Sequence, residues 1–244
     1  EASGSMCGRF AVDLPPELIG RMFETRNATP NMPPNWNTAP SQMALVVRRQ
    51  PQTGERHLDP LQWGLLPSWT KDPKAAQRPI NARAETVAKL PTFRDAYAKR
   101  RAIVPVQAFY EWKRDPDQPK VPFAIARADG SPLALAGLWE GFKGADGEVV
   151  RTFCLLTTEA NEPMQAVHHR MPVILEPEDW PLWLGEQEGD VNTLLRPAAD
   201  DVLRLWPIST AVNAVRNNGA DLLAPLQAPE APAPSPAPAG PNPA

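Results

Sequence analysis

Four short apolar segments follow one another in the middle of the chain, and their spacing constrains the fold more than any other feature of the sequence. They are 101–113 (RAIVPVQAFYEWK), 121–128 (VPFAIARA), 133–142 (LALAGLWEGF) and 149–157 (VVRTFCLLT). Turn signals such as Asp129-Gly130 and Asp146-Gly147 separate them, and Asp-Gly pairs favour tight hairpins. Because strands joined by short turns pair antiparallel, the sequence predicts a mainly antiparallel, barrel-like β core.

Helices are expected to flank this core. Pro15-Pro16 opens a short helix that places Leu18, Ile19 and Met22 on one face. Further helices are predicted at 83–99, 161–169 and 177–184, and further strands at 44–47 and 202–208. The expected fold class is therefore α+β.

Composition narrows the setting of the protein. The 244 residues are 42% hydrophobic, enough for a substantial core, and no stretch approaches the roughly 18 apolar residues of a membrane span. The net charge of −3 argues against a general DNA-coating protein, so phosphate would have to meet a local basic groove. Cys7 and Cys154 make no disulfide framework, which favours a reducing, cytoplasmic setting, and Cys154 is expected to be a buried structural thiol.

The two ends of the chain differ from the rest. Gln227 is followed by an Ala/Pro tract, and we predict that 227–244 form a disordered tail because such a tract buries too little apolar surface to order itself. If Met6 is the natural start, residues 1–5 are a remnant of an expression vector. Residues 6–226 contain no linker or repeat, which predicts a single domain.

Cys7 directly follows Met6. If the initiator methionine is removed, Cys7 carries a free α-amine beside its thiol, so two nucleophiles lie on adjacent carbons. Such a 1,2-aminothiol can capture an aldehyde as an imine and close to a thiazolidine, which an internal cysteine cannot do. The alternative is a small buried hydrophobic residue in a first strand.

Asn81, Arg83 and Glu85 bring an amide, a guanidinium and a carboxylate into five positions. They are typical of an N-cap Asn followed by charges on a solvated helix. Alternatively, Asn81 positions a reacting amine and Arg83 binds an anion such as phosphate.

Glu111 lies between two aromatic residues at the end of an apolar segment. If it is desolvated there, its pKa is raised and it can serve as a general acid or base near neutral pH. If the strand alternates, Glu111 instead faces solvent and pairs with Lys113 or Arg114.

His168 and His169 are adjacent at an expected helix end. Neighbouring helical residues diverge by about 100°, so the pair is unsuited to one metal ion, and no metal site is predicted. One histidine can stabilise the helix end, while the other can transfer protons.

Trp63 and Trp69 flank a Gly- and Pro-containing loop. Loop tryptophans usually pack onto the core, but exposed ones form stacking platforms for nucleobases, with charge here from Arg9, Lys71 or Arg83.

Together these segments resemble the SOS-response-associated peptidase (SRAP) family of abasic-site-processing proteins. The matching stretches are Cys7-Gly8-Arg9-Phe10, Asn37-Thr38-Ala39-Pro40, Trp63-Gly64-Leu65-Leu66-Pro67, Asn81-Ala82-Arg83-Ala84-Glu85-Thr86, Phe109-Tyr110-Glu111-Trp112, His168-His169-Arg170-Met171-Pro172 and Val212-Asn213-Ala214-Val215. Each motif is weak alone, but their order along nearly all of 6–226 is specific.

The resemblance implies a sensor of abasic sites in single-stranded DNA that forms a thiazolidine crosslink through its N-terminal cysteine and removes the preceding residue as a peptidase. It implies Cys7 as nucleophile, Asn81 holding the α-amine, Glu111 as acid and base, and His168 rather than His169 assisting sugar-ring opening. Arg9, Arg83, Trp69 and Pro40 are the implied DNA-binding residues. It also implies the SRAP fold, no cofactor and, as we expect, a monomer.

One departure matters, because residues 1–6 still precede Cys7 and leave it without a free α-amine. Uncut protein should therefore bind single-stranded DNA without crosslinking it. Two other functions stay open: a thiol peptidase acting on other proteins through Cys7 and His168, and a noncatalytic single-strand binding module.

Overall fold

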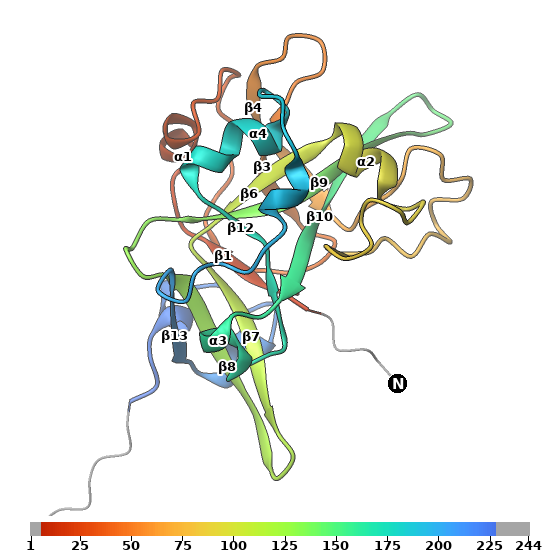
Figure 1. Cartoon of the computed structure of the whole chain (residues 1–244). Helices are drawn as coiled ribbons and strands as arrows, with labels where there is room; N and C mark the ends of the chain where they lie inside the picture. The colour runs from red at the N-terminus through yellow and green to blue at the C-terminus, as the bar shows by residue number, and fades with distance from the viewer. Residues whose placement is uncertain (1–5, 228–244) are drawn as a thin grey trace, which may run out of the picture.

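In a computed structural model, which describes residues 6–227, five strands close into a barrel (Figure 1). They are β3 (Met43–Arg49), β4 (Arg56–Trp63), β6 (Arg101–Val106), β9 (Leu133–Lys143) and β10 (Val149–Glu159). The ring runs β10-β4-β3-β6-β9, and β9 pairs again with β10 to close it. All of these pairings are antiparallel except that of β10 with β4, which is parallel.

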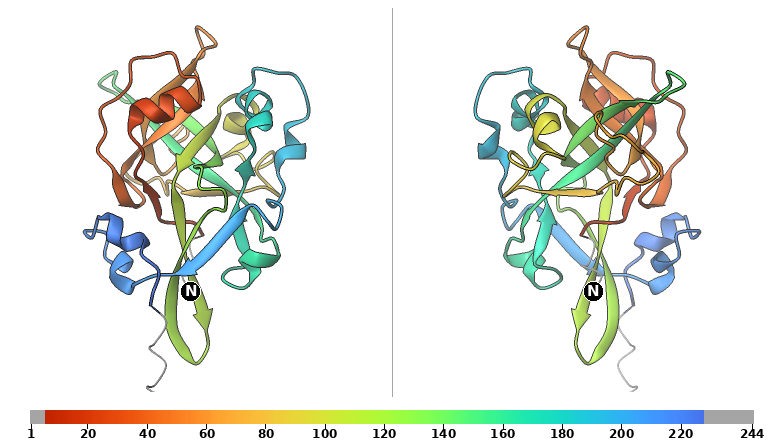
Figure 2. Two further views of the ribbon diagram at one scale, coloured as in Figure 1. Left: turned by 90° about the vertical axis from the view of Figure 1, so that its left-hand side faces the viewer. Right: turned by 90° about the vertical axis from the view of Figure 1, so that its right-hand side faces the viewer.

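A second, five-stranded sheet lies against the barrel. In order across the sheet, its strands are β13 (Leu203–Pro207), β8 (Gln118–Arg127), β7 (Ala108–Asp115), β1 (Phe10–Val12) and β2 (Asn35–Thr38). The β7–β8 hairpin projects beyond the rest of the molecule, and the views of Figure 2 agree on this. The chain passes from the barrel to this sheet at Gln107, whose N–H donates to the Ala11 carbonyl at 2.8 Å.

Short helices and short strands cover the edges of these sheets. The α-helices are α1 (Pro16–Met22), α2 (Arg94–Lys99), α3 (Glu162–Gln165) and α4 (Trp180–Leu184). The 3₁₀ helices are η1 (Pro177–Asp179), η2 (Val191–Leu194), η3 (Thr210–Asn213) and η4 (Ala220–Leu223). The remaining strands are β5 (Asn81–Arg83), which pairs in parallel with β10, β11 (Arg170–Pro172) and β12 (Ile174–Leu175).

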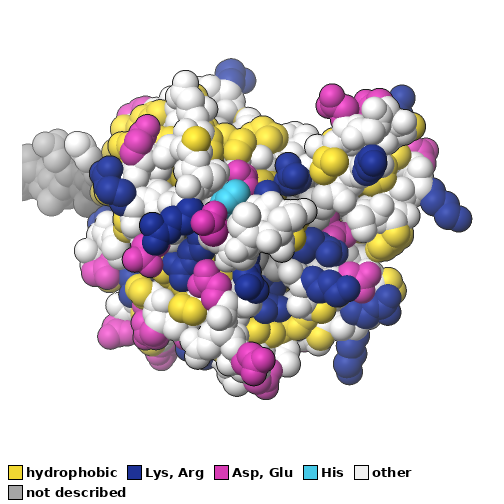
Figure 3. All heavy atoms as spheres, turned by 90° about the horizontal axis from the view of Figure 1, so that it is seen from above, with side chains coloured by type: hydrophobic (Ala, Val, Ile, Leu, Met, Phe, Trp, Pro, Cys, Tyr) yellow, Lys and Arg dark blue, Asp and Glu magenta, His cyan; other side chains and the backbone are white. Residues whose placement is uncertain are grey.

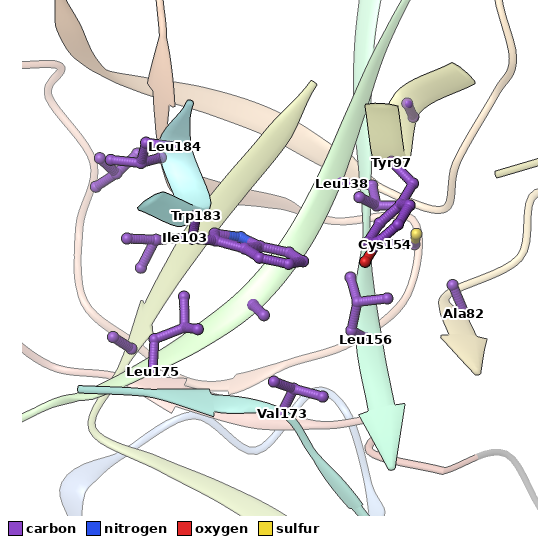
Figure 4. Packing of buried hydrophobic residues seen from close by; sticks show 14 of the residues in the cluster. Ala82, Tyr97, Ile103, Leu138, Cys154, Leu156, Val173, Leu175, Trp183 and Leu184 are labelled. Atoms are coloured by element: carbon purple, nitrogen blue, oxygen red, sulfur yellow. The ribbon is translucent and has the colours of Figure 1, made fainter. Parts of the chain in front are cut away.

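Alternation along the barrel strands divides the core into two clusters, because successive side chains of a strand point to opposite faces. Val47 and Leu156 belong to the cluster that includes residues of α1, α2 and α4. Figure 4 shows Leu156 in this cluster together with Tyr97 of α2 and Trp183 of α4. Trp183 of α4 anchors that cluster with an indole N–H to the Ala102 carbonyl, 2.7 Å away. The neighbouring Val46 and Leu155 belong to a second cluster, which contains residues of β1 and β7.

The α+β class with a barrel-like core is confirmed, although one apolar segment serves two sheets. Segment 101–113 is divided at Gln107 between β6 and β7. Both Asp-Gly turns form, with φ of 82° at Gly130 and 84° at Gly147, but only the second joins paired strands. The first connects β8 to β9, which lie in different sheets. The helix expected at 177–184 is present as η1 followed by α4.

The helix predicted at 83–99 is wrong over most of its length. Residues 81–83 form β5 instead, and the Ala84 N–H extends this pairing to the Thr157 carbonyl at 2.8 Å. Pro91 disfavours helical backbone at the preceding Leu90. Only Arg94–Lys99 is α-helical.

The helix predicted at 161–169 is reduced to α3. The Asn161 side chain caps it by accepting from the Met164 N–H at 3.1 Å, so its start was predicted correctly. Within residues 6–227 no helix is long and apolar enough to cross a membrane. The predictions for residues 1–5 and for the tail from 228 onward lie outside the described residues, and the single domain over 6–226 stays a prediction.

Candidate active site

Cys7 lies just before β1, fully buried among aromatic side chains that include Phe10 and Phe109. Its φ is +40°, a left-handed conformation that costs a residue other than glycine about 1–3 kcal/mol and often marks a functional position. Burial, and secondarily the charge of Glu111, raise the pKa of the Cys7 thiol well above its ordinary value. The thiol is therefore protonated at neutral pH.

Glu111 faces this residue from β7, where it lies opposite Phe123 of β8. It is 4% exposed, so the buried interpretation of Glu111 is correct and the solvent-facing one is wrong. Its Oε2 accepts the backbone N–H of Cys7 at 3.2 Å, across 104 positions of sequence. Desolvation raises the pKa of Glu111 to about 7, although the N–H groups of Cys7 and Trp112 oppose the shift.

Asn81 belongs to strand β5 and does not cap a helix. It lies opposite Leu155 of β10, is half-buried, and donates from Nδ2 to the Ile80 carbonyl at 3.1 Å. Two residues later, Arg83 leaves the strand with its side chain 62% exposed and 3.8 Å from Glu85. The amide is therefore half-buried, while the guanidinium on the same face of the strand is accessible to solvent.

Glu85 is held mainly by Arg170, and its contact with Arg83 is longer. The Arg170 guanidinium forms a bidentate pair with the Glu85 carboxylate at 2.8 and 2.9 Å and also donates to the Thr157 carbonyl. The hydrogen bond from Arg170 lowers the pKa of Glu85. This pair joins the segment after β5 to the segment after His169.

His168 follows α3 and is fixed at both its backbone and its ring. Its N–H donates to the Met164 carbonyl at 2.8 Å, and its Nδ1 accepts the Arg170 N–H at 3.1 Å. The neutral ring therefore carries its proton on Nε2. Burial and the neighbouring His169 lower the pKa of His168, so the neutral form is favoured.

The expectation that the two histidines diverge is wrong, because they lie beyond the helix end. The rings of His168 and His169 stack with centroids 4.5 Å apart. His168 is half-buried while His169 is exposed, which distinguishes the two positions.

Neighbours of Asn81 and His168 share one buried cluster with Cys7. Leu155, beside Asn81, and Met164, which accepts from His168, both belong to the buried cluster that contains Cys7, and Ile80 packs against it. The charge of Arg114 acts on both Glu111 and His168. Glu111 is the side chain in direct contact with the Cys7 backbone, because its carboxylate accepts the Cys7 N–H. In the part of the chain that is described, no group of three His, Cys, Asp or Glu residues could hold a metal ion.

The residues expected to bind DNA occupy different environments. Trp69 is 56% exposed and Pro40 is also exposed, whereas Trp63 is buried and donates from Nε1 to the Ile80 carbonyl. Viewed from above, basic and acidic side chains are interspersed over the surface (Figure 3). The distribution of charged side chains therefore does not mark a single DNA-binding surface on that face.

Arg9 is half-buried and makes contacts within the protein. Its guanidinium donates to the Asn37 side chain at 2.8 Å and the Val212 carbonyl at 2.7 Å, and it lies over the Trp112 ring. The Asn37 amide in turn donates to the carbonyls of Val212, Ala214 and Asn217. These contacts fasten η3 and the residues after it to β1 and β2.

Sequence reasoning missed this clamp and a second buried carboxylate, Glu140. Glu140 stands alone in the apolar segment 133–142, which is the same signal that Glu111 gives. The partners of Asn37 lie about 180 positions away in sequence and leave no local signal.

Comparison with known proteins identifies the family and agrees with this fold. The family model for SOS response associated peptidase (SRAP) matches residues 6–215, and the chain belongs to this family. It is 36% identical over 223 residues to the abasic site processing protein YoqW of Bacillus subtilis (strain 168), an alignment that covers 89% of this chain and 99% of that protein.

Two further likenesses extend the comparison. The chain is 32% identical over 245 residues to the abasic site processing protein YedK of Escherichia coli (strain K12), covering 91% of this chain and 100% of YedK. The crystal structure of a protein from Bacteroides thetaiotaomicron matches with a TM-score of 0.80 at 20% identity, covering 91% of this chain and 100% of that one. At that identity the match supports the fold alone.

Proposed function

We propose that this protein processes abasic sites in single-stranded DNA by capturing their aldehyde covalently through Cys7. The observation that carries the proposal is the 3.2 Å hydrogen bond from the Cys7 backbone nitrogen to the buried Glu111 carboxylate. When Cys7 is the first residue, that nitrogen is an α-amine beside a thiol, already in contact with an acid and base. The names of the YoqW and YedK relatives support the same substrate.

The chemistry follows from the two nucleophiles of one residue. The α-amine adds to the aldehyde carbon of the ring-opened sugar, and loss of one water gives an imine. The Cys7 sulfur then adds to the imine carbon while its proton passes to the nitrogen, which closes a thiazolidine. Glu111, whose pKa is raised to about 7, accepts the proton of the ammonium and donates one to the departing hydroxyl.

The other candidate side chains act on the sugar and the strand. Asn81 holds the amine, and neutral His168 donates from Nε2 as the sugar ring opens. Arg83 and Trp69, both largely exposed, contact phosphate and base, and Pro40 lies on the strand's path. Arg9 supports the site through Asn37 and Trp112 and adds positive charge near it.

A peptidase step must come first in a chain that begins before Cys7. Met6 is 8% exposed, and the strained Cys7 backbone holds the bond between the two residues beside Glu111. The Cys7 sulfur attacks the Met6 carbonyl carbon, and the thiol proton passes by way of Glu111 to the departing nitrogen. Water hydrolyses the resulting thioester, which releases the preceding residues and frees the aminothiol.

The test compares two forms of the protein on abasic single-stranded DNA. Protein that begins at Cys7 should give a product that survives denaturation, while uncut protein of residues 1–244 should bind the DNA without forming it. A Cys7→Ser protein keeps the amine but cannot form the sulfur ring, so its adduct should persist only after borohydride reduction. Crosslinking by uncut protein with residues 1–6 intact contradicts the proposal.

The second cysteine supplies the matched control. Cys154 is fully buried in the other core cluster, so Cys154→Ala should crosslink as the wild type does. On incubation of the 244-residue protein, mass spectrometry should show loss of residues 1–6 in wild type and not in Cys7→Ala, and a crosslink should appear only on molecules that have lost these residues. Cleavage of added proteins without DNA would favour a thiol peptidase, and binding unchanged by Cys7→Ala with no covalent product would favour a noncatalytic module.

A further inference from the structure

Glu140 is a buried carboxylate that the proposed chemistry does not use. It lies on β9 and is 2% exposed. A charge in such a position is stable only when it is paired and hydrogen-bonded, so its partners indicate what it does. Glu140 forms an ion pair with Arg100, and its Oε2 accepts the Ser68 N–H at 3.1 Å.

A second buried acceptor stands beside it. Thr152 of β10 pairs across the strands with Glu140, and its Oγ1 accepts the Leu66 N–H at 2.8 Å. Leu66 and Ser68 are two residues apart, so the two side chains bind alternate N–H groups of one segment, as a neighbouring strand does. Strand β4, which pairs with β10, ends at Trp63, and these side chains attach the segment that follows it to β9 and β10.

The attached segment leads directly to Trp69. The Gly64 N–H donates to the Phe153 carbonyl and the Leu65 N–H to the Pro79 carbonyl, both at 2.9 Å. The backbone is therefore held from residue 64 to residue 68, while the Trp69 indole that follows remains 56% exposed.

The Trp69 indole forms part of a cavity of about 640 Å³. Phe93 and Pro79 contribute apolar surface to it, and Lys71 and Arg78 contribute positive charge. An aromatic ring with apolar neighbours and nearby cations suits a nucleobase and its phosphate. Pro79, which lines the cavity, precedes Asn81 by two residues.

We infer that Glu140 is a positioning residue that holds the 64–68 segment and thereby sets Trp69 as a platform for a base of the bound strand. The inference rests on the proposed function, because it takes single-stranded DNA as the ligand. Thr152 acts in the same way through Leu66. Without these acceptors the segment leaves β9 and β10, and the indole no longer has a fixed orientation.

A double-mutant cycle on uncut protein tests this inference. The probe is single-stranded DNA with a tetrahydrofuran abasic analogue, which has no aldehyde and reports binding alone. Trp69→Ala should weaken binding about tenfold, as expected for loss of one stacked base. Glu140→Ala should weaken it about three- to tenfold, yet add nothing to Trp69→Ala, because both changes remove the same contact.

Two conservative changes separate positioning from a general loss of structure. Glu140→Gln keeps an acceptor for the Ser68 N–H and should retain most of the affinity. Thr152→Val removes the Leu66 acceptor with little change in shape and should weaken binding. Thr158→Val, in a buried threonine of the same strand, is the matched control and should leave affinity unchanged. If Glu140→Ala does not fold, the double-mutant cycle can be measured with Thr152→Val in its place.

The possible outcomes are distinct. Additive effects of Glu140→Ala and Trp69→Ala, or no effect of Trp69→Ala on binding, overturn the inference and leave the covalent chemistry untouched. If the effects of Glu140→Ala and Trp69→Ala are non-additive but protein beginning at Cys7 does not capture the aldehyde, the proposed chemistry is overturned and the inference about Glu140 stands. With Cys7 first, the Glu140→Gln protein should also capture abasic DNA at the wild-type rate when DNA is saturating.

Discussion

Glu111 and Glu140 are two buried carboxylates in similar surroundings with different partners. Their exposed fractions are 4% and 2%, and each stands in an otherwise apolar strand segment. Both accept a backbone N–H from a distant part of the chain, Cys7 for Glu111 and Ser68 for Glu140. Burial and hydrogen bonding alone therefore do not distinguish a reactive carboxylate from a structural one.

The distinguishing feature is the cation. Glu140 is in contact with Arg100, which offsets its desolvation in place. Glu111 is stabilised mainly by two N–H groups, and the charge of Arg114 is the weakest of the influences on it. Desolvation is therefore the largest influence on the pKa of Glu111, which can exchange a proton near neutral pH. Glu140, paired with Arg100, instead binds the backbone of the loop at Ser68.

The largest expected effect that tests this comparison is a pH-dependent difference in stability at Glu111. The pKa of Glu111 is raised from 4.5 to about 7 in the folded protein, so the folded state binds this proton more tightly than the unfolded state. The stability that this gives is fully present below the unfolded pKa and is lost as the pH rises through 7. That loss amounts to about 3 kcal/mol in the free energy of unfolding. Glu111→Gln has no such charge, so the variant should become more stable than wild type by up to this amount as the pH is raised.

Urea unfolding of both proteins near pH 4 and near pH 8 measures this difference. The two free energies should be similar at the lower pH, where both side chains are neutral. Wild type remaining as stable as Glu111→Gln at the higher pH would mean that Glu111 is compensated as Glu140 is, and the comparison would fail.

The second effect concerns the capture rate. In protein that begins at Cys7, Glu111→Gln should slow covalent capture of abasic single-stranded DNA by about 100-fold or more, because the amide cannot transfer protons. Rapid-quench sampling at saturating DNA gives the rate. The Glu140→Gln variant is the matched control at the other carboxylate, and a similar loss there would remove the distinction between the two sites.

The sequence contains the signal for both carboxylates but not their difference. A lone Glu among apolar residues predicts burial, which the structure confirms for Glu111. The partner that decides the role lies elsewhere: Arg100 precedes Glu140 by 40 positions, and Cys7 precedes Glu111 by 104. Such pairings come from strand order and register, which local patterns do not specify.

The same limit explains where the fold prediction succeeded and failed. Apolar runs and turn signals predicted the strands β6 to β10, and two of the pairs that follow each other in sequence, β7–β8 and β9–β10, are hairpins. The assignment of β6 and β9 to one sheet and of β7 and β8 to the other had no local signal. Residues 81–84 have helix-compatible composition, yet they pair in parallel with β10, which lies about 70 positions later. Tertiary pairing outweighed local propensity at the position that holds Asn81.

The third effect is that Glu140→Gln should destabilise the protein, whereas Glu111→Gln should stabilise it. Glu140→Gln leaves Arg100 without its countercharge, and we expect a loss of about 2 kcal/mol because the Arg100 side chain, 22% exposed, can still reach water. Urea unfolding near pH 8 should therefore move the two Glu→Gln variants in opposite directions relative to wild type. A shift of both in the same direction contradicts the comparison.

The smallest effect extends the comparison to the two stacked histidines. His168 is half-buried with its Nδ1 occupied by the Arg170 N–H, whereas His169 is exposed, so only His168 presents a fixed Nε2–H. Replacing His168 by Ala should slow capture about tenfold, since ring opening of the sugar loses an oriented proton donor. His169→Ala is the matched control and should leave the capture rate near that of wild type. Because the His168 pKa is lowered, its neutral form already predominates at neutral pH, and raising the pH should not narrow the gap between the two variants. Equal rates for both variants would assign no role to the orientation of His168.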